Sequence, residues 1–330
     1  MRDKRISLQD IASLADVTKM TVSRYLRDPN QVSEKNRQKL AKILEDIHYI
    51  PNRAPEILLG SKSRSIGIII PSFKNHIFLE VLAGIESVAS NHGYQTIITN
   101  YDYDKIIEEQ KIINLLSYNI DALILMEKNH TKRAIKYLKS VNIPVAELMD
   151  ISQQSLDIQV GFDNEMAGFD MTQALIKSGK KNIVYFNSIA SARDMSRFEG
   201  YCRAMRDAGY EPKQMLPNMI SSVNLGRSLF HKAIQEYPNI DGVFCTNDDI
   251  AVGVLLECQH YNIPVPEQIA IAGFHGLDIR LANQQQIASV ITPRFDIGKM
   301  ATELLLKRLN GEHVPLLTKL PYQIDSAMTV

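Results

Sequence analysis

From Ser65 onward, short apolar runs of strand length alternate with amphipathic stretches of helix length. The apolar runs cover 66–70, 95–100, 122–126, 145–148, 183–186, 242–245 and 269–273. The amphipathic stretches cover 77–92, 105–118, 131–140, 165–178, 196–208, 226–237 and 249–261. Strands that alternate with helices in this way form parallel sheets with helices on both faces.

The alternation occurs twice, once before about residue 160 and once after it. It therefore predicts a doubly wound α/β fold with two lobes and a cleft between them. Ligands of such folds bind at the carboxyl ends of the strands. The loops expected to face a ligand are 71–78, 126–130, 187–197, 246–249 and 274–278.

The first 50 residues have a different pattern, which predicts three short helices at 8–15, 19–26 and 34–47. Thr18 and Ser33 precede the second and third helices as N-caps. The first two helices have the form of a helix-turn-helix. A break at 49–52 and the polar linker 60–64 separate these helices from the rest of the chain.

Bulk properties restrict the class of protein. Residues 1–64 hold 13 basic and 8 acidic side chains, and the remainder holds 24 and 29, so a basic end meets an acidic body. Such an end is suited to a polyanion, although a solvated charged face would show the same excess. The chain has no 18-residue apolar run and begins with a charged segment rather than a signal peptide, so we expect a cytoplasmic protein. The three cysteines are far apart and predict no disulfide.

The second helix carries side chains that suit a DNA groove. Short hydroxyl groups can contact phosphates, and Lys, Met and Arg can reach base edges in the major groove. The candidate phosphate contacts are Thr18, Thr21 and Ser23, and the candidate base contacts are Lys19, Met20 and Arg24. On these residues alone, a plain helical hairpin with solvated charges remains open.

Longer motifs carry a family resemblance. The stretches DIASLADVTKMTVSRYL, VSEKNRQKL and YIPNRAPEILLG, followed by GFDN, RFEGY, GVFCTNDDIAVG and IAIAGFHGLDI, span essentially the whole chain. This pattern resembles the lactose-repressor/galactose-repressor family of regulators. Within that family the chain is most similar to repressors of gluconate or idonate use.

The resemblance implies roles in DNA binding. Lys19, Met20 and Arg24 match base-reading positions, and Leu8 matches a contact at the start of the first helix. Residues 52–59 match a hinge helix that enters the minor groove, which adds Asn52, Arg53 and Leu58, the last as a wedge between base pairs. A core or linker leucine is the alternative interpretation of Leu58. Paired hinges imply a homodimer on a palindromic operator.

The resemblance also implies a domain plan and an effector site. The plan is a headpiece at 1–50, a hinge helix and linker at 51–64, and a periplasmic-binding-protein-like effector domain at 65–330. The first lobe is expected at 65–161 and 293–320, and the second lobe at 162–292 and 321–330. The expected effector contacts are Ser72, Asn75, Phe78, Asp163, Arg197 and Asn247.

His275 departs from the family pattern, because sugar-binding members commonly have an aspartate there. Loss of a carboxylate removes repulsion against an anionic ligand, and an imidazole can donate a hydrogen bond and carry charge when protonated. Together, His275 and Arg197 suggest that a carboxylate is bound by hydrogen bonds at this position, which favours a sugar acid such as gluconate. A structural loop histidine is the alternative. Glu127 and His130 are either ligand contacts or solvated loop residues.

The expected function is a DNA-binding repressor of carbohydrate-use genes, released by a small-molecule inducer. A co-repressed regulator with a neutral sugar or purine effector, or a sugar-binding module without a regulatory role, remain alternatives. Known nucleophile, zinc and phosphate-loop motifs are absent from the sequence, and Asp248-Asp249 fits loop and helix-start roles better than catalysis, so we expect no enzyme, cofactor or metal. No leucine-heptad segment follows Pro321, which favours a dimer over a tetramer.

Overall fold

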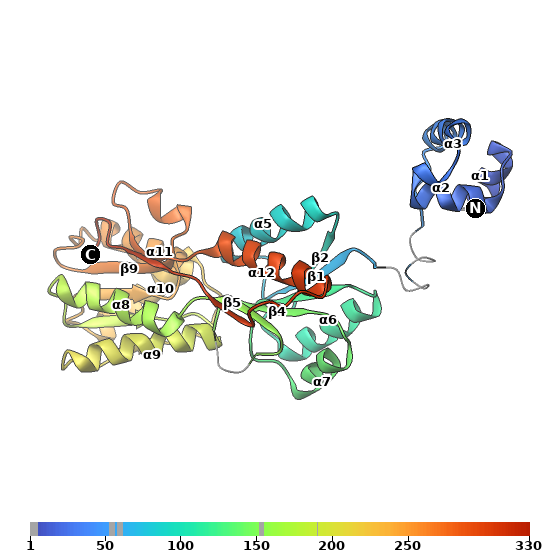
Figure 1. Cartoon of the computed structure of the whole chain (residues 1–330). Coiled ribbons are helices and arrows are strands. Elements are labelled where there is room, and N and C mark those ends of the chain that lie inside the picture. The colour runs from blue at the N-terminus through green and yellow to red at the C-terminus, as the bar shows by residue number, and fades with distance from the viewer. Residues whose placement is uncertain (1–5, 53–56, 58–61, 152–154, 190) are drawn as a thin grey trace. The chain divides into compact units, whose positions relative to one another are not determined.

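A computed structural model describes residues 6–52, 57, 62–151, 155–189 and 191–330. These residues form two compact units, Met1–Ser63 and Arg64–Val330, which are described separately (Figure 1). Most of the expected hinge helix, including Arg53 and Leu58, lies outside the described residues.

The first unit is a bundle of three helices. They are α1 (Leu8–Ala15), α2 (Lys19–Arg27) and α3 (Glu34–Asp46), with a 3₁₀ turn at Pro29–Gln31. Ser7 and Asp10 form a capping box at the start of α1, and the Thr18 hydroxyl caps α2. Ser33 occupies the cap position of α3 without a side-chain hydrogen bond. The core consists of Ile11, Ala12, Ala15, Val22 and Leu40.

The second unit contains two six-stranded sheets, each the centre of one lobe. The first lobe contains β1 (Ser65–Ile70), α5 (Ile77–Ala89), β2 (Gln95–Asn100), α6 (Lys105–Ser117), β3 (Ala122–Leu125), α7 (Lys132–Ser140), β4 (Val145–Leu148), β5 (Ile158–Gly161), α12 (Arg294–Leu309) and β11 (Leu317–Lys319). Its strand order is β11-β5-β4-β3-β1-β2, and the paired strands are parallel.

The second lobe has the strand order β12-β10-β9-β8-β6-β7. It contains α8 (Asn164–Lys177), β6 (Ile183–Phe186), α9 (Ala192–Asp207), β7 (Lys213–Met215), α10 (Val223–Glu236), β8 (Gly242–Cys245), α11 (Asp248–His260), β9 (Ala270–His275), β10 (Ala288–Ile291) and β12 (Gln323–Asp325). The β10–β12 pair is antiparallel, whereas the other pairs in this sheet are parallel.

The alternation of side chains along each strand explains the two helix layers. In β1, Ile66, Ile68 and Ile70 pack in one cluster with α5 and α12, whereas Ile69 packs in another with α6 and α7 (Figure 1). In β6, Tyr185 packs toward α9, whereas Val184 packs toward α10 and α11. Because both faces of each sheet are covered, the central strands are apolar throughout.

The chain passes between the lobes three times: between β5 and α8, between β10 and α12, and between β11 and β12. The apolar runs and amphipathic stretches of the sequence did not predict β5, β7, β10, β11, β12 and α12. Three of these strands have only three residues and half-exposed patterns, so they lack the apolar run that marks a buried strand. Within the described ranges, no helix has the length and apolar character needed to cross a membrane.

Candidate DNA-binding surface and effector cleft

The exposed face of α2 carries the three predicted base-reading side chains. Lys19, Met20 and Arg24 are all exposed, and Met20 leaves 64% of its surface open to solvent. An apolar side chain this open makes little contribution to the headpiece core, and it is available to a thymine methyl group.

The hydroxyl groups of α2 differ in availability. Thr18 Oγ1 accepts a hydrogen bond from the Thr21 backbone amide at 3.2 Å and lies 2.9 Å from Thr21 Oγ1. Ser23 is half-buried, and Leu8 is half-buried against the headpiece core. Asn52 is exposed. The cap bond places the Thr18 hydroxyl at the amino end of α2, where helices bind phosphate oxygens well.

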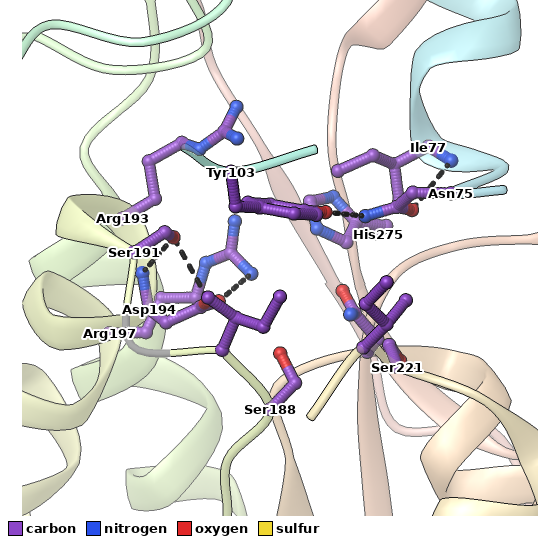
Figure 2. A pocket seen from close by; sticks show the side chains of 13 residues that line it. Asn75, Ile77, Tyr103, Ser188, Ser191, Arg193, Asp194, Arg197, Ser221 and His275 are labelled. Carbon is purple, nitrogen blue, oxygen red and sulfur yellow. Dashed lines mark hydrogen bonds and ion pairs between the residues drawn. The ribbon is translucent and has the colours of Figure 1, made fainter. Parts of the chain in front are cut away.

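In the second unit, a pocket lies between the two lobes. Its cavity volume is about 20 Å³, so the pocket is narrow. Figure 2 shows its side chains converging from both lobes, with Asn75 and Tyr103 from the first lobe and Arg193, Arg197, Ser221 and His275 from the second. Ile77, Ser188, Ile189, Ser191, Asp194, Ile220 and Asn247 complete the lining.

The pocket lies where the strands end. Asn75 follows β1, Ser188 follows β6, Asn247 follows β8, and His275 is the last residue of β9. The carboxyl ends of parallel strands are the usual position of ligand sites in such folds. The segments after β2 and β7 also contribute, through Tyr103 and Ser221, and the sequence analysis did not include them.

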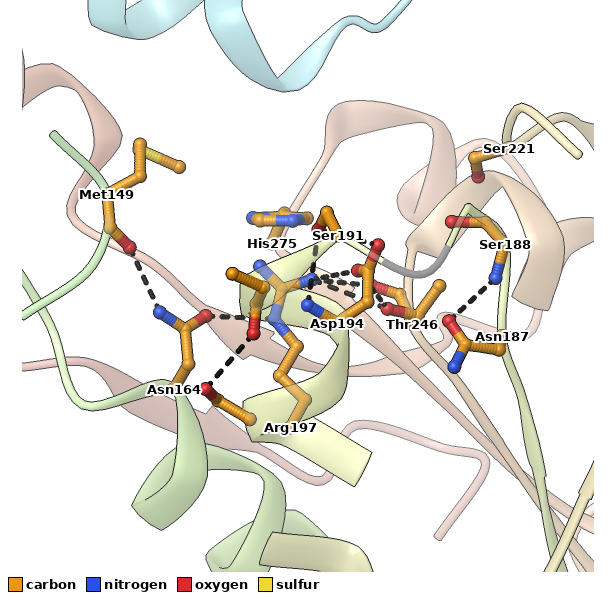
Figure 3. Close-up of polar contacts among 12 residues, drawn as sticks. Met149, Asn164, Asn187, Ser188, Ser191, Asp194, Arg197, Ser221, Thr246 and His275 are labelled. Carbon is orange, nitrogen blue, oxygen red and sulfur yellow. Dashed lines mark hydrogen bonds and ion pairs between the residues drawn. The ribbon is translucent and has the colours of Figure 1, made fainter. Parts of the chain in front are cut away.

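Arg197 is held by a dense set of protein contacts. Its Nε donates to Asn164 Oδ1 at 2.9 Å, and its Nη1 donates to the Thr246 carbonyl at 3.0 Å (Figure 3). The guanidinium carbon lies 4.0 Å from the centre of the Phe274 ring, and Asp194 Oδ1 lies 3.5 Å from Nη1. Arg197 lines the pocket, but two of its three nitrogens already bind the protein.

His275 is fully buried and has an unusual backbone. Its φ of 97° is in the region that favours glycine, and such strain is typical of functional sites. Nδ1 lies 3.3 Å from Thr292 Oγ1, and Nε2 has no hydrogen-bond partner among the described residues. Burial, together with the charges of Arg197, Arg294 and Arg193, lowers the pKa of His275 well below its usual range. This shift favours the neutral imidazole, which can still donate or accept a hydrogen bond.

Four other predicted contacts lie outside this lining. Ser72 is buried and accepts a hydrogen bond from the Lys74 amide, and Phe78 is buried in the first-lobe core. Asp163 caps α8 and forms an ion pair with Lys319. Glu127 lines a neighbouring cavity of about 370 Å³, which shares Tyr103, Ile189 and Ser191 with the first.

His130 is neither a solvated loop residue nor part of either cavity lining. Its side chain is 0% exposed, with Nδ1 3.0 Å from Glu108 Oε2 and Nε2 3.4 Å from Glu147 Oε1. Burial acts to lower the pKa of His130, but the two carboxylates outweigh it and raise the pKa to about 9. The ring thus lies between the carboxylates of α6 and β4, which favour its protonated form.

The adjacent acids at the start of α11 also have structural partners. Asp248 is buried and accepts hydrogen bonds from Ser289 Oγ and from the Leu277 amide, both at 2.6 Å. Asp249 accepts one from Ser221 Oγ at 2.5 Å. These bonds hold the loops around the pocket. In the described part of the chain, no group of His, Cys, Asp and Glu side chains is arranged to hold a metal ion.

Two pocket residues, Arg193 and Asp194, were not singled out in the sequence analysis. The helix expected at 196–208 begins at Ala192, because Ser191 caps it and accepts a hydrogen bond from the Asp194 amide at 3.3 Å. Arg193 and Asp194 therefore lie in a first helical turn that faces the pocket. The Ser191-x-x-Asp194 spacing is a helix-start signal that could have located this turn.

Comparisons with known proteins agree with this architecture. The description "Bacterial regulatory proteins, lacI family" matches residues 7–52, and "Periplasmic binding proteins and sugar binding domain of LacI family" matches residues 63–321. The chain is 54% identical to the HTH-type transcriptional regulator IdnR of Escherichia coli K12, with 100% of each chain covered. It is 48% identical to the regulator GntR of the same strain, covering 100% of this chain and 98% of GntR. A LacI family regulator from Silicibacter pomeroyi has a crystal structure that matches with a TM-score of 0.93 and 29% identity, over 98% of this chain and 99% of that one.

Proposed function

The chain belongs to the LacI family of bacterial transcriptional regulators, and from this premise we propose that it is a repressor released from a palindromic operator by a sugar acid. Membership of this family makes it a DNA-binding regulator rather than an enzyme. We place its action in the cytoplasm, where bacterial DNA lies.

The observation that carries the proposal is the pairing of a helix-turn-helix with a buried, polar pocket in a separate unit. The headpiece presents Lys19, Met20 and Arg24 to solvent, which suits base reading in the major groove. The pocket presents hydroxyl, amide and guanidinium groups from both lobes, which suits a small ligand rich in hydroxyl groups. A ligand held by both lobes stabilises one arrangement of the lobes over another, and a coupling of about 1–3 kcal/mol to DNA affinity is typical.

The proposed effector is a sugar acid such as gluconate. Two features support it: the resemblance to repressors of gluconate or idonate use, and the two arginines, Arg193 and Arg197, in the pocket wall. Of the predicted contacts, we assign Asn75, Arg197, Asn247 and His275 to the effector and leave Glu127 to the adjoining cavity.

We further propose a homodimer. Large apolar side chains are exposed along α5, the edge strand β2 and α11, namely Leu79, Ile97, Ile98 and Leu256. Exposed apolar residues on an edge strand and on helices are expected to be covered by another chain. A twofold dimer matches a palindromic operator, because each headpiece then meets an identical half-site.

The proposal is tested by selecting an operator from random-sequence DNA with the full chain and titrating the complex with D-gluconate, D-glucose and a purine base. We expect a palindromic site, a steep loss of affinity with salt because phosphate contacts release counterions, and release by gluconate alone. Tighter binding on adding ligand would instead identify a co-repressor. Failure to select any preferred DNA sequence would contradict the repressor proposal itself.

A further inference from the structure

Arg193 carries a buried charge that forms no hydrogen bond or ion pair with the side chains that the structure describes. It lies in the first turn of α9, only 4% of its surface is exposed, and it lines the pocket. Its Nη1 has no hydrogen-bond partner among the described residues, and within those residues it forms no ion pair. A buried charged donor that lacks a partner is costly, so it is usually retained for a ligand.

An aromatic ring and two carboxylates near Arg193 favour its charged form. Its guanidinium carbon lies 5.6 Å from the centre of the Phe78 ring of α5, on the opposite lobe. The buried carboxylate of Glu127 and the carboxylate of Asp194 contribute favourable electrostatic interactions without ion-pair contact. The guanidinium thus reaches from the second lobe to the first and keeps free donor capacity.

Arg197 and His275 do not offer the same capacity. Arg197 donates through Nε and Nη1 to Asn164 and Thr246, so its fork is already bound to the framework of the second lobe. His275 is neutral, because burial lowers its pKa. Among the described lining residues, Arg193 is therefore the cationic group that still has hydrogen-bond donors open to a ligand.

We propose that Arg193 receives the carboxylate of the effector and determines the selection of sugar acids over neutral sugars and polyols. This inference rests on the proposed function and adds the residue that reads the charge. Figure 2 shows Arg193 and Ser221 on opposite sides of the pocket, so a ligand with its acid end at Arg193 extends its hydroxyl groups toward Ser221. A guanidinium binds a carboxylate with strong charge-assisted hydrogen bonds, whereas a neutral end group leaves that charge unpaired.

The test compares two ligands that differ at one end, D-gluconate and the neutral D-gluconamide, by titration calorimetry with the full chain. The wild-type protein is expected to prefer gluconate. In Arg193→Gln, gluconate affinity should fall on the order of 10- to 100-fold while gluconamide affinity changes little, because only the charged contact is lost. Arg193→Lys should keep a weaker preference for the acid, because the charge remains but the fork is lost.

A matched control is Arg203→Gln. Arg203 lies on the same helix and forms an exposed ion pair with Glu165, so this variant should bind both ligands as the wild type does. Chemical denaturation followed by circular dichroism reports whether each variant is folded in the effector unit, which is separate from the headpiece. An Arg193→Gln protein that retains the full wild-type preference for gluconate would overturn the assignment of Arg193 and leave the sugar-acid proposal standing. Wild-type protein that binds neither ligand, or prefers the amide, would contradict the sugar-acid proposal itself.

Discussion

At the scale of single residues, some polar side chains of the cleft are bound to the protein, and others are open to a ligand. Arg197 and Asp248 are buried, and each makes at least two hydrogen bonds to the protein. Arg193 lines the same pocket with an Nη1 donor that the described residues leave open, and Asn247 lines it at the start of α11, where its side-chain oxygen accepts no cap bond. Substitution of the first pair is therefore expected to affect folding, and substitution of the second pair to affect binding.

Arg24 tests the base-reading assignment. It is exposed on α2, where an arginine can bind a guanine with two hydrogen bonds. In Arg24→Ala, operator affinity should fall by about 1–3 kcal/mol, while affinity for a scrambled duplex changes little. Fluorescence anisotropy with the two duplexes measures both. An equal loss on both would assign Arg24 to a phosphate instead of a base.

His130 predicts a dependence of stability on pH. Its pKa is raised from 6.5 to about 9 in the folded chain, so the protonated ring stabilises the fold fully below pH 6.5, and this contribution is lost as the pH rises through 9. Over this interval the free energy of unfolding should fall by at most about 1.4 kcal/mol per pH unit from this group. Urea denaturation followed by circular dichroism at several pH values measures the slope. His130→Gln should flatten it, and the exposed His313→Gln should not; the same slope in His130→Gln would contradict the prediction.

At the scale of elements, the pairing of α8 with α9 sets the position of the arginines. A Cβ atom on Gly200 would lie 1.9 Å from the Glu165 carbonyl oxygen, and one on Gly168 would lie 2.3 Å from that of Arg197. The two helices therefore touch backbone to backbone, and only glycine fits at these points. The Arg197–Asn164 hydrogen bond spans the same contact.

Gly200→Ala should accordingly separate α8 from α9. The added methyl group would press against the backbone of α8, which is expected to lower the free energy of unfolding by about 1–3 kcal/mol. Displacement of Arg193 and Arg197 is expected to weaken gluconate binding. Chemical denaturation and calorimetry of the same preparation measure the two effects. Glu199→Ala, at the neighbouring exposed position, is the control. Wild-type stability in Gly200→Ala would show that the helices can move apart without loss.

Elements with a strong local pattern were predictable from sequence, and elements stabilised by distant partners were not. The family and the two-lobed α/β fold are confirmed, and α1 has the predicted bounds because its cap and apolar spacing are local. β11 and β12 were missed because their pairing with β5 and β10 is what makes them strands. The role of Arg193 depends on the absence of a hydrogen-bond partner beside it in the fold. The spacing of residues in the sequence does not reveal this absence.

At the scale of the whole molecule, the exposed apolar residues predict the assembly. Leu79 on α5 is 60% exposed, and Ile106 on α6 is 58% exposed, but the two helices cover opposite faces of the first sheet. If α5 lies in the dimer interface, Leu79→Asp should yield monomers with weakened operator binding, because a charge would be buried there without a partner. Ile106→Asp should remain dimeric. Sedimentation velocity distinguishes these outcomes, and a dimeric Leu79→Asp protein would exclude α5 from the interface.

The three crossings between the lobes also impose an order on biosynthesis. The headpiece is contained in the first 63 residues, so all of its core is available early in translation. The first sheet lacks its edge strand until residues 317–319 emerge, and the second lacks one until residues 323–325 emerge. Thr329 then donates to the Ile271 carbonyl at 2.6 Å and accepts from the Ala288 amide at 2.8 Å. A chain released before residue 317 would thus contain the complete headpiece, but both sheets of its effector unit would lack an edge strand.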